Sequence, residues 1–231
     1  MSVVISPTQT LRRSQLYRRH RQLGADFAQF GDSIAVDHYG DDEVSQARVL
    51  GLADLSTLPR IGFKGLGTPV WADSCGIKQP AQPNWATLQG DNTLVARLSS
   101  NELLLASNLT GSSKLIETLA TATRADRVYA LPRGDSHSWL SLCGEQAANT
   151  LAKVCAVDFR AQYFTNLQIA QTSLAKINAV IVRTDIGDNL NYAIFSDSCS
   201  LEYLWDSLLD AMSEYRGRAI GLQALRDRAT L

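Results

Sequence analysis

The segment 134–215 most constrains the fold of this chain, because strand patterns and helix patterns alternate along it. Its last helix is predicted by apolar side chains that recur with the 3.6-residue period of one helix face: Leu201, Leu204, Trp205, Leu208, Leu209 and Met212. Asp197 or Ser198 can cap the first amide groups of this helix, and Gly217 is expected to end it. Strands are predicted where short apolar runs occur, at residues 139–142, 179–182 and 194–195. The segment therefore predicts an α+β core.

The middle of the chain predicts a second set of strands. A hairpin is expected at residues 94–98 and 103–106, followed by a helix at 112–123 and a strand at 128–131. Residues 51–63 resemble one strand that Pro59 interrupts, which indicates an edge strand or a bulge. Residues 68–93 are rich in Pro and Gly and contain Trp71 and Trp85, so we expect a long loop. Its tryptophans could face a ligand, anchor an interface or simply pack beneath the loop.

The N-terminal segment 11–30 is basic and helical in pattern. Its apolar stripe consists of Leu16, His20, Leu23, Phe27 and Phe30, and its arginines are Arg12, Arg13, Arg18, Arg19 and Arg21. This pattern favours the solvated face of an ordinary amphipathic helix, and the alternative is a helix that binds an anion or a partner. Gly24 weakens such a helix by about 1 kcal/mol relative to alanine, so a break there is compatible with the pattern. Residues 1–10 are predicted to be a flexible tail.

Charge and cysteine usage bound the possible functions. The net charge of the 231 residues is −1, which gives no reason to expect attraction to nucleic acid or to an anionic membrane. We find no membrane-spanning apolar run and no secretory signal. The four cysteines are not in CxxC spacing, which indicates free thiols and a cytoplasmic location. The three histidines have no zinc-site spacing, so no metal site is expected.

Four stretches and one further residue in the last hundred residues form a recognisable pattern: Trp139-Leu-Ser-Leu-Cys-Gly144, Leu151-Ala-Lys-Val-Cys-Ala-Val-Asp158, Phe164, Ala170-Gln-Thr172 and Tyr203-Leu-Trp-Asp-Ser-Leu-Leu-Asp210. In this pattern the chain resembles the gamma subunit of heterotetrameric sarcosine oxidase. That subunit belongs to the superfamily of the glycine-cleavage T-protein, an aminomethyltransferase that binds tetrahydrofolate. Gly221-Leu-Gln-Ala224 is similar to a step that precedes the C-terminal segment of the family.

The beginning of the chain resembles the opening of a T-protein, most clearly at Gly51-Leu-Ala-Asp-Leu-Ser56. It departs from the family directly afterwards, where Thr57-Leu58 replace the usual His-Met. The resemblance implies a folate-binding, T-protein-like fold over residues 11–231, with mixed and antiparallel sheets and packed helices. It also implies two interleaved lobes, approximately 11–132 and 133–231, and the absence of the C-terminal barrel domain.

Asp91 and Asn92 are candidate site residues on the strength of this resemblance. In the T-protein family a pair of aspartates opens the corresponding strand, and a carboxylate there acts near the folate reaction centre. Here the pair is Asp-Asn, so the resemblance implies one remaining carboxylate, Asp91, that could orient a substrate amine and stabilise a developing positive charge. The alternative is a turn before a hairpin, where Asp and Asn are favoured for conformational reasons.

Arg183 and Tyr192 complete the folate pocket that the resemblance implies, together with Asn92. At the position where the family holds the pteridine with a glutamate, this chain has Ala193. A pterin edge presents paired donors that a carboxylate accepts and an alanine cannot. Folate affinity is therefore expected to be reduced.

These observations lead to two functional hypotheses. The first is an accessory or folate-binding subunit in sarcosine or glycine one-carbon metabolism, not catalytic alone, whose sarcosine-oxidase-type partner subunits carry the flavin; this chain contains no flavin motif. The second is a stand-alone aminomethyltransferase that uses tetrahydrofolate and Asp91. A structural domain with an unrelated ligand beneath the 68–93 loop is a third reading.

Overall fold

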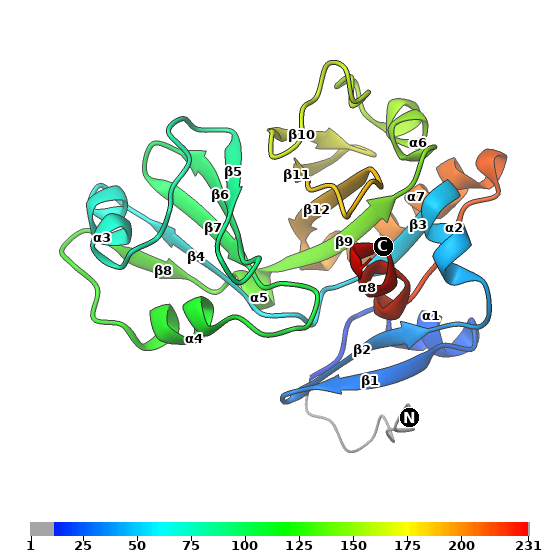
Figure 1. Ribbon diagram of the computed structural model, residues 1–231, viewed down its shortest axis with the longest axis horizontal. Helices are drawn as coiled ribbons and strands as arrows, with labels where there is room; N and C mark the ends of the chain where they lie inside the picture. The colour runs from blue at the N-terminus through cyan, green and yellow to red at the C-terminus, as the bar shows by residue number, and fades with distance from the viewer. Residues whose placement is uncertain (1–11, 231) are drawn as a thin grey trace.

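Three β-sheets organise the chain (Figure 1), and the computed structural model describes residues 12–230. A two-stranded antiparallel hairpin comes first, formed by β1 (Asp26–Phe30) and β2 (Ser33–His38). A five-stranded antiparallel sheet contains, in spatial order, β5 (Trp85–Leu88), β6 (Leu94–Ser99), β7 (Glu102–Ala106), β4 (Arg60–Lys64) and β8 (Tyr129–Leu131). A six-stranded sheet contains β10 (Ile169–Leu174), β11 (Ile177–Arg183), β12 (Asn191–Asp197), β9 (His137–Cys143), β3 (Gly51–Asp54) and β13 (Arg218–Ala219), with only β13 and β3 parallel.

The helices of the described part connect and cover these sheets. They are α1 (Tyr17–Gln22), α2 (Glu43–Val49), α3 (Thr68–Ser74), α4 (Lys114–Thr121), α5 (Arg133–Ser136), α6 (Ala147–Val154), α7 (Leu201–Met212) and α8 (Leu222–Thr230). Short 3₁₀ turns at Ser198–Ser200 and Ser213–Tyr215 flank α7. None of the helices within residues 12–230 has the length and apolar character that a membrane span requires.

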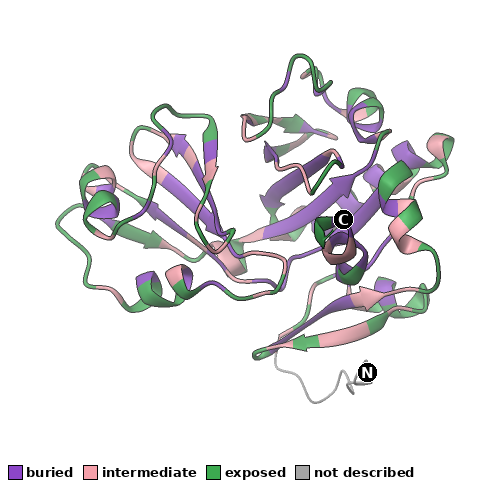
Figure 2. Cartoon of the chain, in the orientation of Figure 1, coloured by how far each residue is buried: buried purple, intermediate pink, exposed green. Residues whose placement is uncertain are grey.

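The core is arranged in layers on either side of the two large sheets (Figure 2). On one face of the six-stranded sheet, Leu140 packs with Leu208 of α7 and Leu151 of α6. The next residue along β9, Trp139, points to the opposite face and packs with side chains of the five-stranded sheet. The outer face of the five-stranded sheet is covered by α3 and α4, and Phe63 there contacts Trp71 with ring centroids 4.6 Å apart.

The predicted α+β architecture is confirmed, and so are the hairpin β6–β7 and the apolar face of α7. Asp197 is indeed an N-cap, since its side chain accepts a hydrogen bond from the Cys199 amide at the turn that leads into α7. In the six-stranded sheet, β3 from the first half of the chain pairs with β9 from the second half. The predicted flexible tail, residues 1–10, lies outside the described residues.

Residues 12–30 do not form one helix, contrary to the prediction for the segment 11–30. Only Tyr17–Gln22 are helical, and residues Asp26–Phe30 form β1. The reason is Gly24, whose φ of +80° turns the chain so that Phe27 packs back on Tyr17, with ring centroids 5.3 Å apart.

Two other sequence predictions were wrong in their boundaries. The proposed loop 68–93 contains a helix and a strand: Pro69 stands in the first turn of α3, where its missing N–H costs nothing, and Trp85 begins β5. The proposed single strand 51–63 is two strands, β3 and β4, which Pro59 separates into different sheets.

The cysteines are free thiols: Cys75, Cys143, Cys155 and Cys199 form no disulfide. Cys143 and Cys155 are buried. Burial raises the pKa of the Cys143 thiol to about 12, so this side chain behaves as a small apolar group.

Candidate functional site

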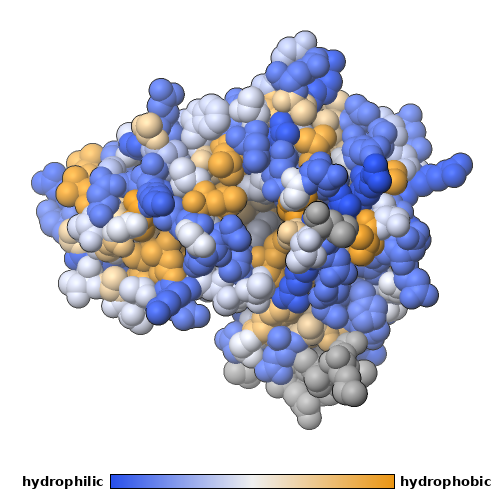
Figure 3. All heavy atoms as spheres, viewed as in Figure 1, coloured by the Kyte–Doolittle hydropathy of each residue, from blue (hydrophilic) through white to orange (hydrophobic). Residues whose placement is uncertain are grey.

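A cavity of about 500 Å³ lies between the two large sheets and beside α8. The surface is hollowed between the lobes in Figure 3, and both polar and apolar residues surround the opening. Its wall comes from six parts of the chain: Leu55 after β3, the facing ends of β5 and β6, the loop after β7, strand β9, the loop 184–187 with strand β12, and α8. A cavity of this size at the junction of two lobes is the leading candidate for a ligand site.

The wall is rich in neutral polar groups. The amide side chains are Asn92, Asn108 and Asn191, and the hydroxyl groups are Ser107, Thr110, Ser141, Thr184 and Thr230. Several of these groups are already paired within the protein, since Ser141 donates to the Asn191 side chain at 2.5 Å and Asn191 donates to Thr184. Trp139, Leu94 and Ala193 supply apolar surface.

Two charged side chains line the cavity within the described residues, Asp185 and Arg226. Asp185 accepts two hydrogen bonds from Arg183, at 2.9 and 2.6 Å, so its charge is largely neutralised. Arg226 donates from Nε to the Leu109 carbonyl at 3.0 Å, and its guanidinium lies 4.9 Å from the centre of the Phe30 ring. Burial lowers the pKa of Arg226, but the side chain stays protonated at neutral pH.

The structure places Asp91 and Asn92 in a tight turn between β5 and β6. Asn92 has a left-handed φ of +61° and lines the cavity, whereas Asp91 does not. The Asp91 carboxylate accepts from the Thr93 amide at 2.9 Å, and the Ser113 hydroxyl lies 3.5 Å away. Burial opposes ionisation of Asp91, but hydrogen bonds from Thr93 and Ser113 outweigh it and lower the pKa. This geometry is that of an Asx turn, which supports the conformational alternative for the pair.

Arg183 is buried behind the cavity wall rather than on it. Besides its ion pair with Asp185, its guanidinium donates to the Phe164 carbonyl at 2.7 Å and to the Ala161 carbonyl at 3.2 Å. The hydrogen bonds to Asp185 raise the pKa of Arg183 further. Arg183 therefore holds the loop 184–187 in place and reaches the cavity only through Asp185.

Tyr192 lies on the opposite face of β12 from the cavity. Its side chain is fully buried beside α6, and its hydroxyl donates to the Phe159 carbonyl at 2.5 Å. Burial raises the pKa of Tyr192 to about 12. Its neighbour Ala193 points the other way and does line the cavity. Of the four predicted site residues, the structure thus brings only Asn92 to the cavity wall. Asp91 and Arg183 do not line the cavity, but each is the sequence neighbour of a residue that does, Asn92 and Thr184 respectively.

Sequence reasoning missed Trp139, Asn108, Asn191 and Arg226 as cavity residues. Trp139 was recognised only as part of a strand, and its place on the wall follows from sheet alternation combined with the position of the second sheet. Arg226 follows the motif Gly221-Leu-Gln-Ala224. No sequence pattern around it indicates that α8 lies against the cavity.

A pterin ring is a poor match for this wall. Its donor edge is best held by a free carboxylate that accepts two hydrogen bonds. Within residues 12–230 the one carboxylate on the wall is Asp185, and both its oxygens accept from Arg183. Ala193 occupies the wall where the resemblance places a glutamate. No described group of His, Cys, Asp and Glu side chains could hold a metal ion.

Comparison with known proteins agrees with this fold. The model of the GCVT N-terminal domain matches residues 86–229, and the chain belongs to this family. The sequence is 28% identical to a sarcosine oxidase subunit gamma from Corynebacterium sp. (strain U-96), over 75% of this chain and 84% of that subunit. It is 25% identical to an aminomethyltransferase from Acidobacterium capsulatum, over 93% of this chain but 61% of that protein.

Solved structures show the same two kinds of relative. The heterotetrameric sarcosine oxidase from Corynebacterium sp. U-96, in complex with pyrrole 2-carboxylate, contains a chain that matches with a TM-score of 0.63 and 26% identity, over 75% of this chain and 91% of that one. The glycine cleavage system aminomethyltransferase T from Bartonella henselae matches with a TM-score of 0.69 and 20% identity, over 95% of this chain and 62% of that one. The resemblance inferred from the sequence is confirmed, and so is the T-protein-like fold.

Proposed function

We propose that this chain is an accessory subunit of a sarcosine-oxidase-type enzyme and does not catalyse a reaction by itself. The observation that supports the proposal is the match to a sarcosine oxidase gamma subunit, to which the chain is 28% identical over 84% of that subunit. Its partners would be the flavin-carrying subunits that oxidise the amine.

The cavity supports the same conclusion. Asp91 is held in a turn by Thr93, Asp185 is paired with Arg183, and Ala193 stands on the wall. None of these arrangements leaves a carboxylate free to act on a bound amine or to hold a pterin. A subunit that retains the fold of the family without a free carboxylate at the cavity fits these contacts best.

The direct test is assembly. The full chain, co-expressed with sarcosine-oxidase-type flavoprotein subunits from the same organism, should elute from gel filtration as a complex larger than any single subunit. Elution of the chain as a lone monomer, with the oxidase subunits assembled without it, would contradict the proposal.

The competing function, a stand-alone aminomethyltransferase, makes a different prediction. Tetrahydrofolate supplies a carrier for one-carbon units, and that enzyme would have to bind it. We expect calorimetry of the isolated chain with tetrahydrofolate to show no binding with a dissociation constant below about 1 mM. That limit corresponds to a binding free energy of roughly −4 kcal/mol. Tight binding that is lost in Asp91→Ala would favour the enzyme instead.

A further inference from the structure

Three of the five arginines of the N-terminal segment have no ion-pair partner among the described residues, and together they form a cationic surface. Residues 12–21 contain five arginines and no acidic residue. Two of the arginines are paired with distant carboxylates, Arg12 with Asp135 and Arg19 with Asp206. The other three, Arg13, Arg18 and Arg21, are exposed and form no ion pair with any residue between 12 and 230.

This surface is fixed to the body of the protein. Leu16, the residue before α1, and His20 of α1 are buried, and the His20 ring packs on Trp205 of α7 with centroids 5.1 Å apart. The Arg19–Asp206 ion pair holds α1 against the same helix. Arg18 and Arg21 are three residues apart in α1 and therefore neighbours on its outer side, where their like charges repel. A docked acidic group would relieve this repulsion.

Exposed apolar side chains accompany the arginines. Leu23, at the C-terminal end of α1, is 51% exposed, and Tyr203 of α7 is 54% exposed. Leu23 also lines a groove of about 480 Å³ together with Leu209 of α7 and Arg218. Arginine, tyrosine and exposed aliphatic groups in one area are the composition of a protein interface.

The charge of the rest of the chain argues against a nucleic acid as the partner. The sequence has 22 Lys and Arg and 23 Asp and Glu; with five arginines in this segment, the remainder has 17 basic and 23 acidic side chains. A long polyanion would meet net repulsion outside the arginine surface. A folded protein with a local acidic patch needs to contact only this surface.

We propose that Arg13, Arg18 and Arg21, with Leu23 and Tyr203 beside them, form the surface on which an acidic face of a partner subunit docks. This inference rests on the proposed function, because it supplies the place where the accessory subunit meets its oxidase. Charged residues at such a surface act mainly on the association rate and its dependence on salt.

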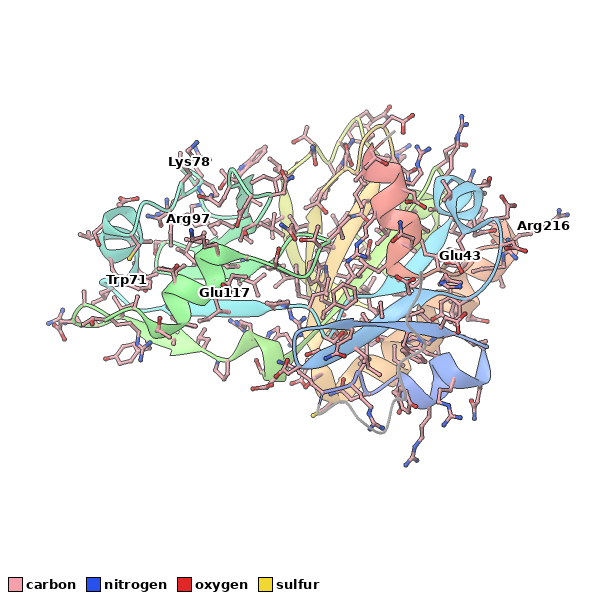
Figure 4. The ribbon with its side chains drawn as sticks, turned by 60° about the horizontal axis from the view of Figure 1, so that its bottom comes forward. Glu43, Trp71, Lys78, Arg97, Glu117 and Arg216 are labelled. Carbon is pink, nitrogen blue, oxygen red and sulfur yellow. The ribbon has the colours of Figure 1, made fainter. Side chains whose placement is uncertain are left out.

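The test compares two charge-matched triple variants with the wild-type chain. The first is Arg13→Gln, Arg18→Gln and Arg21→Gln. The control is Lys78→Gln, Lys114→Gln and Arg124→Gln, which removes three exposed cations from the five-stranded-sheet lobe. Lys78 lies on the opposite side of the molecule from α1 (Figure 4). Thermal denaturation of both variants should match the wild type, because the substituted side chains are exposed.

Association with the co-expressed oxidase subunits is measured by surface plasmon resonance at several salt concentrations. We expect the arginine variant to associate about tenfold more slowly at low salt, with a weaker salt dependence, and the lysine control to behave as the wild type. If the wild type and both variants assemble with equal rates, the docking surface is wrong and the proposed function stands. If the wild type does not assemble with the oxidase subunits, the proposed function and the docking surface are both wrong. Binding of duplex DNA through these arginines would also overturn the docking surface.

Discussion

At the scale of single residues, a buried hydrogen-bonded chain joins the N-terminal segment to the six-stranded sheet. The Asp54 carboxylate of β3 accepts from His20 Nε2 at 2.9 Å, from the Ser14 hydroxyl, and from the Ser56 amide at 2.9 Å. The Tyr39 hydroxyl is hydrogen-bonded to the other ring nitrogen of His20 at 2.7 Å. Burial raises the pKa of Tyr39, so its hydroxyl stays protonated.

This chain predicts a pH dependence of stability. Burial of Asp54 favours its neutral form, but hydrogen bonds and the charge interaction with His20 outweigh it and lower the pKa below the ordinary value of 3.8. The ionised carboxylate therefore stabilises the fold above that value, and the contribution is lost as the pH falls through the lower pKa of the folded state. We expect Asp54→Asn to reduce the free energy of unfolding by about 3 kcal/mol at pH 7.

The measurement is urea unfolding of the wild type and Asp54→Asn from pH 7 down to pH 3. The difference between them should begin to shrink below about pH 4, because Asp54 of the unfolded wild type takes up a proton there while the folded protein keeps its carboxylate ionised. A difference that stays constant down to pH 3 would show that the charge of Asp54 is not what stabilises the fold. Asp54→Asn does not alter the Ser56 side chain, which donates to the Trp139 carbonyl at 3.4 Å, so the comparison measures the loss of the carboxylate alone.

At the scale of elements, α7 shows how a helical pattern becomes a packed helix. The periodicity marks both Leu208 and Leu209 as apolar-face residues, but only Leu208 is fully buried, against the six-stranded sheet. Leu209 is partly exposed at the edge of the groove beside α1. Periodicity identifies the apolar stripe, and the tertiary packing decides which side of the stripe faces the sheet.

The two leucines provide a matched pair of substitutions. We expect Leu208→Ala to lower the free energy of unfolding by about 3 kcal/mol, because the lost contacts leave a cavity in the core. Leu209→Ala should cost less than about 1.5 kcal/mol, since water can fill the vacated space. Guanidinium unfolding of both variants measures the difference, and equal losses would contradict the packing described for α7.

At the scale of the whole molecule, Arg60 holds the junction between the two large sheets. Its guanidinium is buried and donates to carbonyl groups on both sides of the junction: those of Leu55, Ser56, Leu58, Gly134 and His137. Burial, together with the nearby charge of Arg12, lowers the pKa of Arg60 to about 10, so it remains a cation at neutral pH. No carboxylate within residues 12–230 forms an ion pair with it.

Replacing Arg60 should therefore destabilise the entire fold. In Arg60→Met the carbonyl groups would stay buried without a donor, and we expect the free energy of unfolding to fall by about 3 kcal/mol. Arg124→Met, an exposed arginine of the same lobe, is the control and should change it by less than about 0.5 kcal/mol. A similar loss in both variants, measured by urea unfolding, would mean that the carbonyl cluster does not depend on Arg60.

The sequence by itself determined the class of fold and most of the regular elements, because periodic burial leaves a local record in the order of the residues. It also identified Asp91 and Asn92 as a possible turn and Ala193 as a departure from the family. Tertiary structure alone decided that Tyr192 turns away from the cavity while Ala193 lines it, and that Arg183 neutralises Asp185. The reason is physical: a cavity wall is assembled from segments far apart in the chain, and no short stretch of sequence records which of them meet.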